Sequence, residues 1–217
     1  ATDEIVAALN ERRIVMAFEP VVTTHSREPA FYEALMRIRR TDDTYSDASA
    51  IIPVAERLGL VRLIDHRALE LVVAELVAAP GLTLSINASP SSTVDPDWWS
   101  GLAARLKTYP GVAERLIVEI TETAAIRDID ETRGLVARIK DLGCRIALDD
   151  FGAGYTSFRN LRQLGVDIIK IDGAFVQNIT RSGDDRIFVQ TLIDLSHRLG
   201  LKTVAEWVQS ETAAAQL

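Results

Sequence analysis

The chain alternates short apolar runs with longer stretches in which apolar residues recur at helical spacing. Short, nearly continuous apolar runs are typical of strands buried on both faces, as in a parallel sheet covered by helices. Runs of this kind predict strands at residues 14–19, 31–38, 82–87, 115–120, 145–149, 167–171 and 201–205. The alternation predicts an α/β fold.

Two amphipathic stretches between these runs predict helices, at 61–79 and 131–142. In the first, Ile64, Ala68, Leu71 and Val72 fall on one face. Some of the amphipathic stretches end in Leu followed by Gly, which is typical of a left-handed cap at the carboxyl end of a helix. The glycines in question are Gly59, Gly143, Gly165 and Gly200.

Polar residues stand at or near the carboxyl ends of several predicted strands: Asn87, Glu119, Asp149, Lys170 and Glu206, with Glu33 inside another. Only a closed ring brings so many strand ends to one point, and in (β/α)₈ barrels that point is the active site. We therefore expect one domain over residues 1–217, a modified TIM-like (β/α)₈ barrel. Its last strand and helix would lie beyond Leu217, so the chain is expected to be a fragment of a longer protein.

Composition narrows the class of partner. The net charge of −7 argues against binding a nucleic-acid polymer, which needs a basic surface. It leaves open a small phosphorylated ligand whose charge is met by metal ions. No apolar run approaches membrane-spanning length, so no membrane contact by this domain is expected. Cys144 is the only cysteine and lies beside a predicted strand, which favours a buried, inert thiol.

The stretch from Ile146 to Tyr155 carries the most chemistry. Its apolar run ends in Asp149 and Asp150, followed by a turn through Gly152 and Gly154. Carboxylates at the end of a buried strand are costly unless something there needs their charge, and a hard cation is the simplest candidate. The glycines allow a tight turn into a helix expected over 156–163, and this turn is a candidate gating loop.

These motifs, taken in order, resemble the EAL domain, the cyclic di-GMP phosphodiesterase family. The name-giving triplet is Glu33-Ala34-Leu35. The other matching segments are Ile52-Pro53-Val54-Ala55-Glu56, Asn87-Ala88-Ser89-Pro90, Glu119-Ile120-Thr121-Glu122, Asp149 to Tyr155, Lys170-Ile171-Asp172 and Ala205-Glu206. Each motif alone is weak, but the ordered set covers almost the whole chain and is highly specific.

The resemblance implies a role for each matching position. It implies Glu33, Lys170 and Glu206 as catalytic residues, with Lys170 holding or activating the attacking water. It implies Arg37 and Asp172 as substrate-binding residues and Glu122 as a support for the loop after Asp150. Asp149 would bridge two metals, and the ligand set implied for the two-metal site is Glu33, Asn87, Glu119, Asp149, Asp150 and Glu206.

The chemistry of these residue types agrees with that assignment. Carboxylates with one amide suit Mg²⁺ or Mn²⁺ rather than a soft metal. Two such ions stabilise the attacking and the leaving oxygen of an in-line displacement. The implied reaction is hydrolysis of cyclic di-GMP to linear pGpG in bacterial second-messenger signalling.

Two other functions stay open. The first is a catalytically impaired EAL domain that binds and senses cyclic di-GMP. It is motivated by the early end and by Trp207-Val208-Gln209, where the family usually has Gly-Val-Glu. Such a Trp is expected to displace the loop after Glu206. The second is an unrelated barrel enzyme such as an aldolase, which requires the ordered motifs to match by accident.

The resemblance also implies partners and a location. It implies a homodimer, with the packing pair Trp98 and Trp99 or the segment after Asp172 as candidate contacts. It implies other signalling domains in the full-length protein. The location expected is the bacterial cytoplasm, with a membrane tether elsewhere in the full-length protein as an option.

Overall fold

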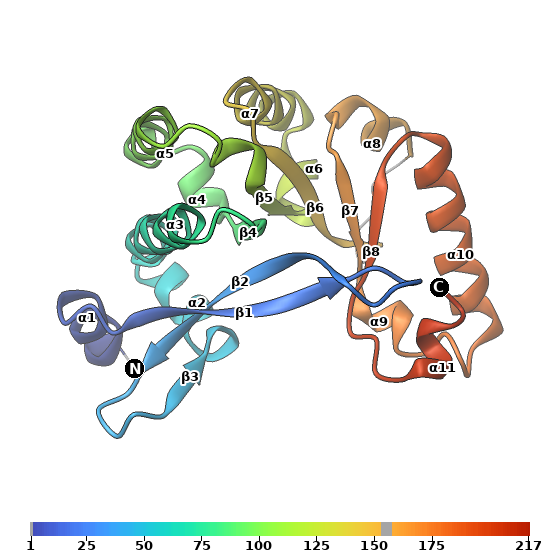
Figure 1. Cartoon of the computed structure of the whole chain (residues 1–217), viewed down its shortest axis with the longest axis horizontal. Helices are drawn as coiled ribbons and strands as arrows, with labels where there is room; N and C mark the ends of the chain where they lie inside the picture. The colour runs from blue at the N-terminus through green and yellow to red at the C-terminus, as the bar shows by residue number, and fades with distance from the viewer. Residues whose placement is uncertain (1, 153–157) are drawn as a thin grey trace. The chain divides into compact units, whose positions relative to one another are not determined.

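The computed structural model describes residues 2–152 and 158–217 (Figure 1). The candidate gating turn falls mostly at 153–157 and so lies outside the described residues. The chain divides into two compact units, which we describe one at a time. The first comprises Ala1–Val21 and Ala30–Ile117, and the second comprises Val22–Pro29 and Val118–Leu217.

In the first unit, strands β1, β2 and β4 are neighbours in that order within the sheet. β2 and β4 are parallel, with Glu33 beside Ser85, and β3 pairs antiparallel with β2. The strands are β1 (Ile14–Val22), β2 (Pro29–Arg39), β3 (Tyr45–Asp47) and β4 (Leu84–Asn87). The helices are α1 (Thr2–Asn10), α2 (Ala48–Arg57), α3 (Val61–Ala78), α4 (Pro90–Thr93) and α5 (Pro96–Thr108), followed by the 3-10 turn η1 (Ala113–Arg115).

Two features of this sheet were not predicted. The amide of Arg39, at the end of β2, donates to the carbonyl of Arg13, just before β1, so these two strands run antiparallel (Figure 1). β3 has only three residues in a polar segment, which is too short for a hydrophobic pattern to reveal. The core beneath the sheet joins α1, α2 and α3 to β1 and β2 through buried residues that include Ile5, Ile14, Ile38, Ala55 and Ile64.

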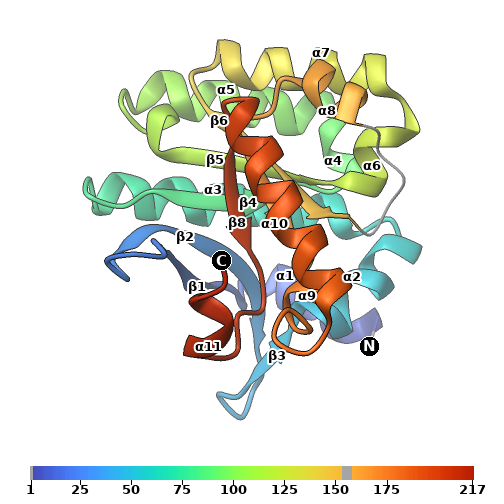
Figure 2. The same cartoon turned by 90° about the vertical axis from the view of Figure 1, so that its right-hand side faces the viewer.

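In the second unit β5, β6, β7 and β8 are neighbours in that order. β6 and β7 are parallel, as are β7 and β8. The strands are β5 (Leu116–Thr121), β6 (Arg145–Phe151), β7 (Ile168–Ile171) and β8 (Lys202–Ala205), and β5 begins in the first unit. The helices are α6 (Glu122–Arg127), α7 (Ile129–Asp141), α8 (Phe158–Leu164), α9 (Gly173–Val176), α10 (Gly183–Arg198) and α11 (Glu211–Ala214). Helix α10 packs along β8 and against α9 (Figure 2).

The predicted elements are confirmed where the hydrophobic pattern was strong. Each predicted strand overlaps an observed one, and the two predicted helices correspond to α3 and α7. The helix expected over 156–163 corresponds to α8. The capping glycines all have positive φ: 67° at Gly59, 88° at Gly143, 74° at Gly165 and 77° at Gly200. Within the described ranges, no helix is both long and apolar enough to cross a membrane.

Candidate metal-binding active site

A buried lysine organises the polar residues of the second unit. The side chain of Lys170, on β7, is 1% exposed. Its Nζ donates a 2.7 Å hydrogen bond to Glu119 Oε2 on β5. The same Nζ forms 3.0 Å ion pairs with Asp149 Oδ1 on β6 and Glu206 Oε1 after β8. Four adjacent strands therefore bring one ammonium and three carboxylates together, as the polar strand ends predicted.

This arrangement carries an excess of negative charge. Counted at formal charge, three carboxylates and one ammonium sum to −3 + 1 = −2, and the side chains of Glu119 and Lys170 are almost entirely removed from water. Like charges at this separation, poorly screened by solvent, repel strongly. Within these four side chains one ammonium offsets only one of three carboxylates, so their oxygens are suited to accept a cation.

A bulge explains how adjacent residues serve one cluster. Successive residues of a regular strand point to opposite faces, so Asp149 and Asp150 would normally diverge. On β6 the register changes between Leu148, which pairs with Ile169, and Phe151, which pairs with Ile171. The extra residue is a β-bulge, and Asp150 takes a φ of 54° there. The bulge and the left-handed backbone turn both carboxylates toward the same place.

The two acids of this bulge, together with Glu206, have a geometry that fits a divalent cation. Asp149, Asp150 and Glu206 each offer a carboxylate oxygen, and these oxygens lie within 4.8 Å of one another. Asp149 Oδ1 is buried and lies 3.0 Å from Lys170 Nζ, its ion-pair partner. An all-oxygen donor set of this kind suits Mg²⁺ or Mn²⁺.

Glu33 and Asn87 lie together in the first unit. Asn87 Nδ2, at the end of β4, donates a 3.1 Å hydrogen bond to Glu33 Oε1 on β2. The amide therefore orients the carboxylate, while its own oxygen is left to accept or to ligate. Arg37, four residues further along β2, pairs instead with Asp47 at 3.2 Å, so a phosphate would have to compete with that carboxylate.

Two further residues predicted to belong to the site, Glu122 and Asp172, accept hydrogen bonds from backbone amides of the second unit. Glu122 is buried and its Oε2 accepts a 2.9 Å hydrogen bond from the amide of Gly152, the residue that follows the bulged strand. Asp172 caps helix α9, because its Oδ1 accepts a 2.8 Å hydrogen bond from the amide of Ala174. The substrate-binding role of Asp172 and the loop-support role of Glu122 stay predictions.

One residue that supports the segment after Asn87, Asp65, was not predicted from the sequence. Asp65, on α3, is buried and its Oδ2 accepts a 3.0 Å hydrogen bond from the amide of Ser89, two residues after Asn87. Burial raises the pKa of Asp65 above its ordinary value, against the opposing effect of bonds from Ser89 and Ser92. The signal was present in the sequence: Asp65 directly follows Ile64 on a helix whose apolar face is buried.

The tryptophans divide into a buried pair and an exposed one. Trp98 and Trp99 pack edge to face inside the first unit, with exposures of 0% and 7%. Their burial makes them packing residues, with little side-chain surface left for contact with a second subunit. Trp207 is 62% exposed and has a φ of 53°. Glu206, directly before it, pairs with Lys170, and the displacement expected for the loop after Glu206 stays a prediction.

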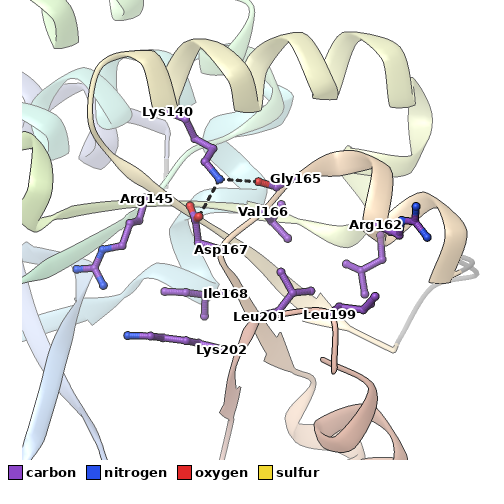
Figure 3. Close-up of a pocket in the computed structure, with 12 residues that line it drawn as sticks. Lys140, Arg145, Arg162, Gly165, Val166, Asp167, Ile168, Leu199, Leu201 and Lys202 are labelled. Carbon is purple, nitrogen blue, oxygen red and sulfur yellow. Dashed lines mark hydrogen bonds and ion pairs between the residues drawn. The ribbon is translucent and has the colours of Figure 1, made fainter. Parts of the chain in front are cut away.

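A separate cavity of about 460 Å³ opens at the amino-terminal ends of β6, β7 and β8 (Figure 3). Its lining includes the cationic side chains of Lys140, Arg145, Arg162 and Lys202. Among the described residues of the lining, the one carboxylate is Asp167, which is held by Lys140 at 2.8 Å and by the amide of Ile146. Because this cavity lies at the opposite ends of the strands from Lys170, it is separate from the metal-binding cluster.

Comparison with known proteins identifies the family. The EAL domain family model matches residues 2–217, so the chain belongs to the EAL domain family. The chain is 29% identical over 208 residues to the cyclic di-GMP phosphodiesterase PdeF of Escherichia coli, covering 94% of this chain and 28% of PdeF. It is 31% identical over 202 residues to an uncharacterized signaling protein of Caulobacter vibrioides, covering 93% and 25%. The chain thus spans about a quarter of the length of these relatives.

Solved structures support the same assignment. The PaMucR phosphodiesterase in complex with c-di-GMP matches with a TM-score of 0.93 and 26% identity, over 100% of this chain and 90% of that one. The FimX EAL domain of Pseudomonas aeruginosa bound to c-di-GMP matches with a TM-score of 0.90 and 25% identity, over 100% and 88%. These matches confirm the predicted fold class, an α/β fold of the TIM-like barrel type.

Proposed function

We propose that this chain is a metal-dependent phosphodiesterase that hydrolyses cyclic di-GMP to linear pGpG. The observation that carries the proposal is the carboxylate excess around Lys170, at the carboxyl ends of neighbouring strands. Relatives named as cyclic di-GMP phosphodiesterases support the substrate. A phosphodiester brings negative charge, which this acidic cluster accepts only when cations are bound there.

The proposed metal ligands follow from the resemblance and the local geometry. Asp149, Asp150 and Glu206 would hold one cation through their converging oxygens. The resemblance assigns Glu33 and Asn87, with Glu119 and Asp149, to the other. Bound Mg²⁺ or Mn²⁺ would supply a nucleophile of lowered pKa and would neutralise charge on the phosphoryl oxygens.

The protein's own residues then have separable tasks. Water adds to phosphorus, the bond from phosphorus to the ribose O3′ breaks, and the leaving oxygen takes up a proton, which yields the 5′-phosphate of pGpG. Lys170 places a fixed positive charge where the transition state gains negative charge, and its bonds to Glu119 and Asp149 hold it there. Asn87 keeps the Glu33 carboxylate oriented.

The test is hydrolysis of cyclic di-GMP by the purified chain with Mg²⁺ or Mn²⁺, followed by chromatography for pGpG. We expect Asp149→Asn, which keeps the shape but removes a charge, to lower kcat about 10²- to 10³-fold. Asp167→Asn is the matched control, because Asp167 lies at the other ends of the strands. Activity that persists without both Glu33 and Asp149 would refute the mechanism. Tight binding without product, even with Mn²⁺, would instead identify a sensor.

The wider biological setting follows from the resemblance alone. We propose a homodimer attached to other signalling domains in the bacterial cytoplasm. Sedimentation of the chain with and without cyclic di-GMP tests the dimer, which a single monomeric species at micromolar concentration would contradict.

A further inference from the structure

Trp207 combines a strained backbone with an exposed aromatic ring. It directly follows Glu206, whose carboxylate belongs to the metal-binding cluster. Its φ of 53° lies in the left-handed region, which bulky side chains rarely adopt. Strain of this kind persists only when surrounding structure holds it, and it gathers at functional sites. Asp150, on β6, also has a positive φ, and its carboxylate belongs to the same metal-binding cluster.

Gly173 provides the support that holds this ring. A Cβ atom at position 173 would overlap Trp207 Cδ2, Cε3 and Cγ, so the indole rests directly on the glycine backbone. Gly173 begins helix α9, immediately after the Asp172 cap that follows β7. The ring is therefore fixed between the carboxyl ends of β7 and β8, and no other residue type at position 173 would leave room for it.

The second face of the indole is open. Trp207 is 62% exposed although one side lies on Gly173, so most of its remaining surface meets solvent. A flat aromatic surface that is already immobilised loses little conformational entropy when a ligand stacks on it. This surface lies one residue from a carboxylate of the cation site.

We infer that Trp207 is a base-stacking residue, which receives one guanine of the substrate while a neighbouring phosphodiester lies at the metal-binding cluster. The inference rests on the proposed function and extends it to base recognition. Stacking of a base on an aromatic side chain corresponds to about 5- to 150-fold in affinity. Trp207 stands where the family usually has Gly. The structure accommodates it because the indole lies on Gly173, while Glu206 still pairs with Lys170.

The first test separates stacking from a merely structural role. Trp207→Ala should raise the KM for cyclic di-GMP about 5- to 150-fold, and Trp207→Phe should recover most of that loss. The half-saturating Mn²⁺ concentration should move less than about twofold, because stacking does not involve Glu206. If Trp207 acts only by positioning Glu206, the Mn²⁺ dependence and kcat would shift together with KM, and the inference would be wrong.

The second test uses the glycine support. Gly173→Ala should raise KM in the presence of Trp207, since the added methyl displaces the indole. In a Trp207→Ala background the same substitution should change KM by less than about twofold. Equal effects in both backgrounds would contradict the inference.

Fluorescence gives a readout independent of turnover. Trp98 and Trp99 are buried, so acrylamide quenching should report Trp207, and cyclic di-GMP should protect it. Hydrolysis by the unmodified chain with no protection and an unchanged KM in Trp207→Ala would overturn the stacking inference alone. An unmodified chain that neither hydrolyses nor binds cyclic di-GMP would overturn the proposed function as well.

Discussion

Replacing Lys170 with methionine is the most direct test of the charge balance in the cluster. Methionine nearly preserves the length of the side chain but removes its only charge. The substitution changes the local sum from −2 to −3, in a group whose Lys170 and Glu119 side chains are essentially inaccessible to water. Removing one partner from a buried ion pair typically costs about 3–5 kcal/mol, because the remaining charge stays buried.

That cost should appear in metal-free protein. For a chain of this size each kcal/mol lowers the melting temperature by about 2–4 °C, so Lys170→Met should melt about 6–20 °C lower in EDTA. A cation bound to the carboxylates stabilises the folded state by about 2.7 kcal/mol at one hundred times its dissociation constant. Since Lys170 no longer competes for the same oxygens, Mn²⁺ should stabilise the variant more than the unmodified protein.

Lys140→Met is the matched control. Lys140 also pairs with a carboxylate, Asp167, at 2.8 Å, but its side chain is 44% exposed. Exposed pairs are worth at most about 1 kcal/mol, so its melting temperature should fall by less than about 4 °C, with or without Mn²⁺. The reasoning is refuted if the two variants lose equal stability in EDTA, or if Mn²⁺ raises both melting temperatures equally. Urea unfolding checks the same difference at constant temperature.

Three further predictions concern other parts of the chain. Burial raises the pKa of Asp65, so the contribution of this group to the free energy of unfolding is complete below pH 3.8 and is lost as pH rises through the folded-state pKa. Asp65→Asn should abolish this loss of stability, measured by urea unfolding at a series of pH values. Burial raises the pKa of Cys144 to about 12, so its thiolate fraction at pH 8 falls roughly a thousandfold and it should react with iodoacetamide only after unfolding. Gly152→Ala meets a φ of 108° and the rings of Phe175 and Phe188 at 3.1 Å and 3.2 Å, and should cost about 1–3 kcal/mol, whereas Gly183→Ala, with open space, should cost less than 1.

The hydrophobic pattern predicted the strands and the longer helices because those elements bury continuous apolar surface. It did not predict the direction of β1 or the existence of β3. The hydrophobic pattern of a strand is the same whether the strand is parallel or antiparallel to its neighbour. Its direction shows only in hydrogen bonds such as that from the Arg39 amide to the Arg13 carbonyl. The pairing of Arg37 with Asp47 was missed for the same reason, since β3 is what brings Asp47 opposite Arg37.

The candidate site was predictable as a set of residue types at strand ends, but not in its geometry. Asp149 and Asp150 suggested a cation because they are adjacent, yet adjacency in a regular strand would have separated them. Their convergence depends on the bulge opposite β7 and on the positive φ of Asp150, and neither is visible in the residue order.

Backbone strain connects these two parts of the second unit. Asp150 and Trp207 both have φ near +54°, and both directly follow a residue that pairs with Lys170. Left-handed backbone costs a residue with a Cβ atom about 1–2 kcal/mol. For Asp150 the cost turns a second carboxylate into the cluster, and for Trp207 it lays the indole on Gly173. The strained backbone thus places one side chain at the candidate cation site and the other where it would stack on a base, so the two proposed contacts share one conformational origin.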